Sequence, residues 1–267
     1  MTGDPLLALL RRDRIVVLWG LAAVICGAWA YLLLGAGIEM DMADMMDRGG
    51  GRMAATMPPW TLGYGALIFA MWAVMMAVMM LPSTAPAILL VATLARRRAA
   101  GFVPGVAAFF ASGYLLVWIG FSIAATGLQW GLAEAGLLSG TMAAANRAVA
   151  GGVLIAAGLY QWSPLKDACL RHCRSPVAFL VGHWRKGAAG AVANGLRHGL
   201  FCLGCCWMLM ALLFVGGVMN LAWVAAIALI VLVEKMLPAG RWMGRAIGGL
   251  FVAWGVAALA SLWPGAG

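Results

Sequence analysis

The chain has 267 residues, of which 64% are hydrophobic and 10% are charged, and its formal net charge at pH 7 is +9. Soluble domains are about 45–50% apolar and about 25% charged, so this composition excludes an ordinary soluble protein and predicts an all-α, polytopic transmembrane helix bundle. The Lys and Arg residues lie in short stretches between apolar runs, which indicates contact with membrane lipids and argues against nucleic-acid binding.

Hydropathy divides the chain into seven predicted transmembrane helices within one integral membrane domain, residues 1–267. A span needs about 20 apolar residues, and only helices or closed barrels satisfy the backbone in lipid. The fifth and sixth spans are separated by very few residues and are expected to form a tight antiparallel hairpin. The predicted spans are residues 14–37, 60–81, 102–128, 143–160, 195–217, 221–237 and 247–263.

The first span leads into a predicted outer loop, residues 36–59, that is rich in Met and Asp. The apolar run of this span is longer than the about 7–15 residues of a signal-peptide core, so we expect an uncleaved helix. Thioether sulfur is a soft ligand that suits Cu(I), and carboxylates raise the local concentration of cations. The alternative is a loop whose Met side chains contact lipid. The candidate ligands in this loop are Met42, Met45 and Met46.

The second span carries a row of methionines. Met71, Met75 and Met79 share one helical face, and Met76 and Met80 lie beside them. Such a row could pass a soft ion from one thioether to the next. The alternative is plain packing, because Met is an adaptable core residue and stripes at this spacing are usually buried.

The stretch that follows the methionine row, residues 82–95, is apolar but begins with Pro82 and contains Pro86. Proline inside a helix removes a backbone hydrogen bond and clashes with the preceding turn. We therefore expect a separate short helix here, packed against the bundle and ending at three consecutive arginines.

The cysteines are the strongest chemical signal. Five of the six lie in two groups, one in a predicted basic inner loop over residues 162–195 and one at the start of the fifth span. Within each group the spacing places the side chains on one helical face, and thiolate with imidazole is the ligand set of Zn(II), Cu(I) and iron–sulfur sites. Cys can also be a small buried apolar residue. The candidate ligands are Cys169, His172, Cys173, His198, Cys202, Cys205 and Cys206.

The cysteine spacing matches no fixed zinc-finger or haem-attachment pattern, so it does not identify the metal. It also leaves open whether the two groups meet in space. Thiols on the cytoplasmic side are normally reduced, which favours metal or redox chemistry over a structural disulfide.

Glu234 and Lys235 stand at the inner end of the sixth span. An acid near the membrane is a candidate functional residue. We nevertheless expect Glu234 to form an ion pair with Lys235 or with a nearby arginine at the interface.

The distribution of basic residues predicts the orientation. With the N-terminus in the cytoplasm, all but three of the 18 Lys and Arg residues fall on the inner side; the exceptions are Arg48, Arg52 and Arg147. The positive-inside rule therefore favours a cytoplasmic N-terminus and a multi-pass protein of a bacterial inner membrane.

Four segments resemble the hallmark blocks of the domain-of-unknown-function 2182 family, whose bacterial members are catalogued as predicted metal-binding integral membrane proteins. They are MWAVMMAVMMLPSTAP (residues 71–86), GLYQWSPLKDACLRHCRSP (158–176), GLRHGLFCLGCCWMLM (195–210) and VMNLAWVAAIALIVLVEKMLP (218–238). They occur in the expected order and span most of the chain from the second helix onward. By position, the resemblance implies the same seven Cys and His ligands.

These observations favour a protein that binds or transports a soft transition metal, with copper preferred over zinc. Outer Met and Asp would capture the ion, and the Cys and His residues would receive it on the cytoplasmic side. A metallochaperone or another membrane protein is an expected partner. Nothing in the sequence indicates an enzyme, but two alternatives stay open: a membrane oxidoreductase linked to a thiol, quinone or haem, and a zinc-stabilised assembly partner of another membrane complex.

Overall fold

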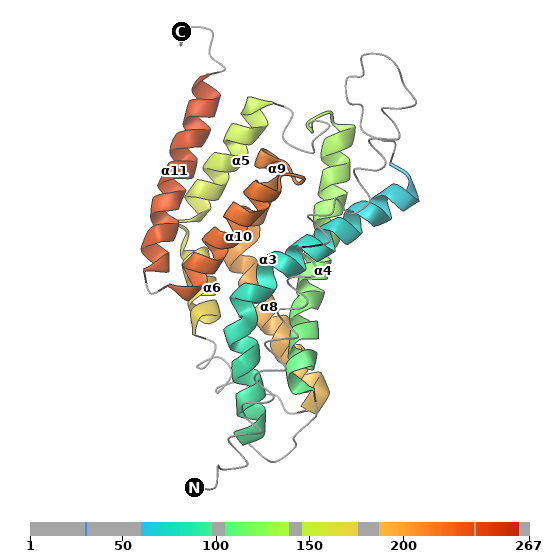
Figure 1. The fold of residues 1–267 in the computed structure, drawn as a ribbon. Coiled ribbons are helices and arrows are strands. Elements are labelled where there is room, and N and C mark those ends of the chain that lie inside the picture. The colour runs from blue at the N-terminus through green and yellow to red at the C-terminus, as the bar shows by residue number, and fades with distance from the viewer. Residues whose placement is uncertain are drawn as a thin grey trace.

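A computed structural model describes residues 60–97, 105–138, 146–175, 187–237 and 239–261, together with Ala30. The first predicted span and the outer loop with Met42, Met45 and Met46 lie outside these residues. The described part is built of helices, which confirms the all-α prediction (Figure 1). The helices are α3 (Leu62–Arg97), α4 (Val106–Glu134), α5 (Arg147–Tyr160), α6 (Pro164–Arg174), α8 (Gly187–Ala211), α9 (Leu213–Gly216), α10 (Leu221–Met236) and α11 (Gly240–Ala260).

Several of these helices are long and apolar enough to cross a membrane, which confirms a multi-span membrane protein. Four such stretches occur among the described residues: Leu62–Thr93, Val106–Glu134, Gly187–Gly216 and Gly240–Ala260. A fifth results if α5 and α6, which meet at 64°, form one broken span. Helix α10 matches the predicted sixth span, but its 16 residues fall short of the roughly 20 that a span needs. Seven spans therefore remain a prediction.

Helix α3 continues through both prolines, so the prediction of a separate short helix over residues 82–95 is wrong. The helix changes direction partway along its length (Figure 1). Near the prolines, side chains supply hydrogen bonds to the backbone: Ser83 and Tyr114 both donate to the carbonyl of Met80, at 2.9 and 3.3 Å. Buried neighbours and hydroxyl side chains of this kind allow a membrane helix to tolerate proline.

Glycines set the closest helix pair, α4 with α8. A Cβ atom on Gly113 or Gly195 would overlap the backbone of the opposite helix, so only glycine permits this approach. Helices α5 and α11 pair in the same way, through Gly158 and Gly248. Close contact through small residues is the usual way for helices to associate in lipid, where burial of apolar surface supplies little driving force.

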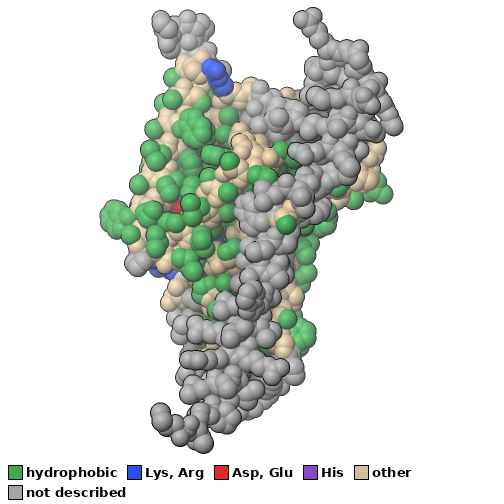
Figure 2. Space-filling view, viewed as in Figure 1, with side chains coloured by type: hydrophobic (Ala, Val, Ile, Leu, Met, Phe, Trp, Pro, Cys, Tyr) green, Lys and Arg blue, Asp and Glu red, His purple; other side chains and the backbone are tan. Residues whose placement is uncertain are grey.

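The outer surface of α5, α10 and α11 is apolar. Figure 2 shows hydrophobic side chains spread over this face with few charges among them. Trp242, Leu250 and Trp254 on α11 are 73%, 68% and 53% exposed. Large apolar side chains on the outside are expected where the neighbour is lipid rather than water.

Candidate metal centre

Helix α6 brings the first group of cysteines to the second. The helix begins with Pro164 in its first turn, and the side chain of Ser163 caps it by accepting a hydrogen bond from the amide of Lys166 at 3.1 Å. It packs along α8, so that the Sγ atoms of Cys173 and Cys205 are 3.9 Å apart. The two cysteine groups, whose meeting the sequence left open, are therefore in contact. Much of the predicted inner loop, residues 162–195, is helix.

Gly204 allows this contact, because a Cβ atom at its position would stand 2.6 Å from the sulfur of Cys169. The backbone carbonyl of Gly204 also accepts a hydrogen bond from the hydroxyl of Tyr160. Both Cys169 on α6 and Tyr160 on α5 thus rest on the bare backbone of α8. Gly204 therefore sets the separation of α6 and α8.

Cys202, Cys205 and Cys206 are buried, and Cys173 lies against them; we call these four residues the cysteine cluster. The thiols of Cys205 and Cys206 donate to the carbonyl of Cys202, at 3.1 and 2.9 Å. The described residues contain no group of three His, Cys, Asp or Glu side chains placed to hold a metal, so the sulfurs meet as pairs.

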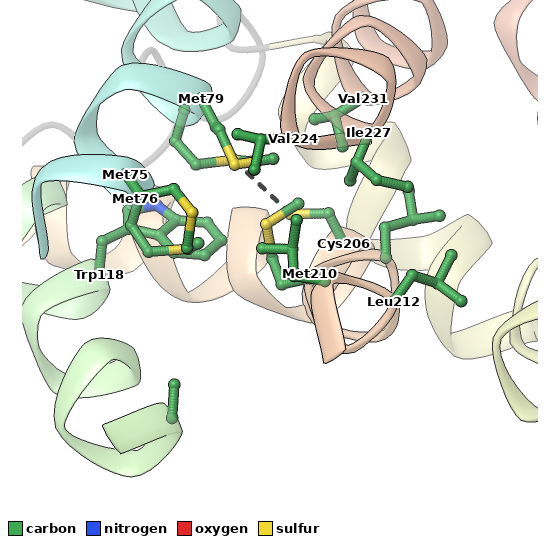
Figure 3. Packing of buried hydrophobic residues seen from close by; sticks show 14 of the residues in the cluster. Met75, Met76, Met79, Trp118, Cys206, Met210, Leu212, Val224, Ile227 and Val231 are labelled. Carbon is green, nitrogen blue, oxygen red and sulfur yellow. Dashed lines mark hydrogen bonds between the residues drawn. The ribbon is translucent and has the colours of Figure 1, made fainter. Parts of the chain in front are cut away.

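The methionine row faces the protein interior and not the lipid. Met71, Met75, Met76, Met79 and Met80 are each at most 6% exposed and belong to the same buried core as the cysteines of α8. Figure 3 shows Met75, Met76 and Met79 on one side of this core and Cys206 and Met210 on the other. The thioether of Met80 is the nearest, with its sulfur 3.9 Å from that of Cys206.

Cys202 has two further polar neighbours, Tyr114 and Lys235, that are not among the candidate site residues of the sequence. The hydroxyl of Tyr114 is 3.0 Å from its sulfur, and the ammonium of Lys235 is 2.9 Å from it. The same ammonium donates to the hydroxyl of Ser83 at 3.1 Å. Lys235 was visible as a base at the end of an apolar run, whereas nothing in the sequence pointed to Tyr114.

The two predicted histidine ligands both lie against aromatic rings. His172 stacks on Phe201, with ring centroids 4.2 Å apart, and its Nδ1 is 2.9 Å from the carbonyl of Ala168. His198 is buried beside the rings of Phe110 and Tyr114, at 5.7 and 5.8 Å. Both imidazoles are held by aromatic contacts, and neither comes together with the cysteines in a metal-holding group of the described residues.

The cysteines of α8 lie farther from the start of their apolar helix than predicted. Hydropathy predicts a span that begins at residue 195 and so puts them near its start, but the apolar helical stretch runs from Gly187 to Gly216. Cys202 and Cys206 therefore stand near the middle of this stretch. The small residues before position 195 are part of the helix because they pack against α4, although their hydropathy alone is weak.

Glu234 pairs with Lys166 and not with Lys235 or an arginine, so that prediction is wrong. The carboxylate is 2.7 Å from the ammonium of Lys166 and accepts from Nε2 of Gln161 at 2.9 Å. Lys166 also donates to Oε1 of Gln161. We call Gln161, Lys166 and Glu234 the ionic network. Neighbouring side chains on a helix point about 100° apart, so Glu234 faces α5 and α6 while Lys235 faces α3 and α8.

A family model described as "PpoB2: Copper chaperone" matches residues 69–258, well over half of the chain. The matched region includes the methionine row, the cysteine cluster and Lys235. The name of this family differs from the one the motifs suggested, so the resemblance to the domain-of-unknown-function 2182 family stays a prediction. No curated protein and no solved structure shows significant similarity to the chain.

Proposed function

Because the chain belongs to the PpoB2 copper chaperone family, we propose that it holds Cu(I) within the membrane on the paired sulfurs of Cys173, Cys205, Cys206 and Met80. Copper handling by a multi-span helical membrane protein is the established part of this statement. The proposal concerns the site. The observation that carries it is the contact between α6 and α8, which brings Cys173 and Cys205 to 3.9 Å.

The donor atoms suit Cu(I). Thiolate and thioether are soft ligands that select this ion, whereas Mg²⁺ and Ca²⁺ require oxygen. Cu(I) is stable with a small number of sulfur ligands. A structural zinc site needs four ligands in a tetrahedron, and the described residues assemble the sulfurs only as the pairs Cys173–Cys205 and Cys206–Met80.

The methionines of α3 supply a path to this site. Met71, Met75 and Met79 lie in the same buried core as the cysteines, and thioethers bind Cu(I) without a charge, which keeps the cost of transfer through the interior small. Met42, Met45 and Met46 of the outer loop would capture the ion first. The proposed ligand set is completed by four residues that could take over the ion as it leaves the pairs: Cys169, His172, His198 and Cys202.

The setting of this function is a bacterial inner membrane. We place the N-terminus in the cytoplasm and count seven spans, on the strength of the charge distribution and hydropathy. A protein that delivers copper requires an acceptor, and a soluble metallochaperone or another membrane protein is the partner this role calls for.

The test is copper binding by the full-length protein, purified anaerobically in detergent and titrated with Cu(I) against a chromophoric chelator. Cys205→Ser and Cys206→Ser should each weaken Cu(I) binding by at least about tenfold, because each removes a sulfur from a pair. Cys26→Ser is the matched control, since it removes the sixth cysteine, which belongs to neither group. Equal affinity in all three variants would overturn the site.

The contact between Cys173 and Cys205 also fits a second function, the thiol oxidoreductase considered above. A pair of neighbouring thiols can cycle through a disulfide with a partner thiol. In that case the purified protein would titrate as a reversible dithiol and bind no copper at stoichiometric concentration. Bound Zn(II) that depends on the cysteines, without Cu(I) binding, would point instead to the zinc-stabilised assembly role.

A further inference from the structure

The structure places a lysine ammonium in the protein interior without a carboxylate to balance it. Lys235 is 9% exposed, and its Nζ atom contacts the Cys202 sulfur at 2.9 Å and the Ser83 hydroxyl at 3.1 Å. Among the residues the structure describes, the buried acid Glu234 pairs with Lys166, and Asp167 pairs with Arg241 and Arg245. No acid of the described ranges lies within ion-pair distance of Lys235.

A buried ammonium is strongly unfavourable unless a negative group neutralises it. The Ser83 hydroxyl satisfies a hydrogen bond of Lys235 but carries no charge. The ammonium is nevertheless held in a defined place, because the Ser83 hydroxyl that accepts its hydrogen bond is itself fixed. That hydroxyl donates to the carbonyl of Met80 at 2.9 Å. The positive charge is thus directed at the cysteine cluster.

Cysteines that bind copper would supply a negative charge next to this ammonium. A cysteine must lose its proton to become a metal ligand, and the proton is released to solvent. Two cysteine thiols that bind one Cu(I) release two protons, and the resulting complex carries one negative charge. When Cys202 is one of the two thiolates, the ammonium of Lys235 lies 2.9 Å from it and the site is neutral. The same two thiolates around a divalent ion form a neutral complex, and Lys235 would then be left as an unbalanced buried charge.

We propose that Lys235 determines the specificity of the site, favouring Cu(I) over divalent ions by supplying the counter-charge of a copper dithiolate. This inference rests on the proposed function and adds to it a residue that acts through charge and not as a ligand. Coulomb interactions are far stronger in a protein interior than in water, so a single fixed charge at this distance separates monovalent from divalent ions.

The experiment compares wild-type protein with Lys235→Met, Lys235→Gln and Lys235→Arg, titrated in detergent with Cu(I) and separately with Zn(II). The measured quantity is the ratio of the two affinities, which does not depend on the fraction of protein that is folded. We expect the ratio to fall by about 10- to 100-fold in the Met and Gln variants, through weaker Cu(I) binding and stronger Zn(II) binding, and to be kept in the Arg variant.

Arg241→Met is the matched control, since it lowers the net charge equally at a side chain that is 43% exposed and pairs with Asp167. Its ratio should equal that of wild type. The inference is overturned if Lys235→Gln keeps the wild-type ratio, or if Lys235→Arg loses it as fully as Lys235→Met does. If wild type itself fails to bind Cu(I), the proposed function has failed. If wild type binds through Cys205 and Cys206 but the Lys235 variants keep the ratio, only the specificity role is lost.

Discussion

Two buried polar groups meet α10 at the same turn, and they differ in how their charges are balanced. On one side Glu234 joins Lys166 and Gln161, and both charges are paired at 2.7 Å with 3% exposure of each side chain. On the other side Lys235 contacts the Ser83 hydroxyl and the Cys202 sulfur, and no carboxylate of the described residues lies beside it. In the ionic network each buried charge has a partner of opposite sign, as expected of a structural ion pair. The cysteine cluster instead has an ammonium against a sulfur, an arrangement suited to cysteines that bind a metal as thiolates.

Lys166→Met is expected to have the largest effect, because it disrupts the ionic network. This change leaves Glu234 as an unpaired buried charge, and such losses cost about 3–5 kcal/mol of unfolding free energy. We expect a large drop in the thermal unfolding temperature of the detergent-solubilised protein.

The double variant Lys166→Met with Glu234→Leu is the control for that experiment. It replaces both charges with apolar groups, so most of the stability should return, and Cu(I) affinity should be close to wild type. A double variant that is stable but no longer binds copper would contradict the structural role of the ionic network.

A second change tests the contact that creates the site. Gly204→Val adds atoms where a Cβ alone would stand 2.6 Å from the sulfur of Cys169, so α6 must move away from α8. Overpacking of this kind costs about 1–3 kcal/mol, and Cu(I) affinity should fall by at least tenfold, to about the level of Cys205→Ser.

Gly120→Val serves as the control for Gly204→Val, because a Cβ atom on Gly120 meets nothing within 4 Å. Disulfide formation between Cys173 and Cys205 under mild oxidation, followed by mass spectrometry, reports on the helix separation directly. Unchanged cross-linking in Gly204→Val would show that Cys169 gives way and α6 stays in place.

A smaller effect separates the two roles of the methionines. Met80→Leu keeps the volume of the side chain, so stability should change by less than about 1.5 kcal/mol. The thioether beside Cys206 is lost, and we expect Cu(I) affinity to fall by about tenfold in the chelator titration. Met208 is a half-buried residue that is not a proposed ligand. Met208→Leu should therefore leave the Cu(I) affinity unchanged. Equal affinities in the two variants would assign Met80 to packing alone.

The smallest effect is expected from Arg241→Met. The pair that Arg241 forms with Asp167 at 3.1 Å is partly exposed, and Arg245 still contacts the same carboxylate at 3.0 Å. Exposed pairs contribute about 0–1 kcal/mol, so the unfolding temperature should barely change. A loss comparable with that of Lys166→Met would extend the ionic network to the ends of α6 and α11.

The sequence predicted the helices better than their ends. Composition and hydropathy identified the apolar stretches because lipid imposes the same requirement on every span. The bend region of α3 was assigned to a separate helix, since proline is usually a helix breaker, while Ser83 and Tyr114 supply local hydrogen bonds that the sequence does not reveal. The start of α8 was placed too late because glycine and alanine contribute through packing on α4 and not through hydropathy.

The sequence is sufficient to identify which residue types could form the site, because a 3.6-residue period places Cys202, Cys205 and Cys206 on one side of any helix. The contacts of those residues depend on how the helices pack. Cys173 reaches Cys205 because α6 docks on Gly204, and Lys235 turns to Cys202 while its neighbour Glu234 turns away to Lys166. Local geometry follows from the chain, but the choice of partner depends on which helices pack together, and in this protein close contacts at glycines, Gly204 beside Cys205 among them, contribute to that choice.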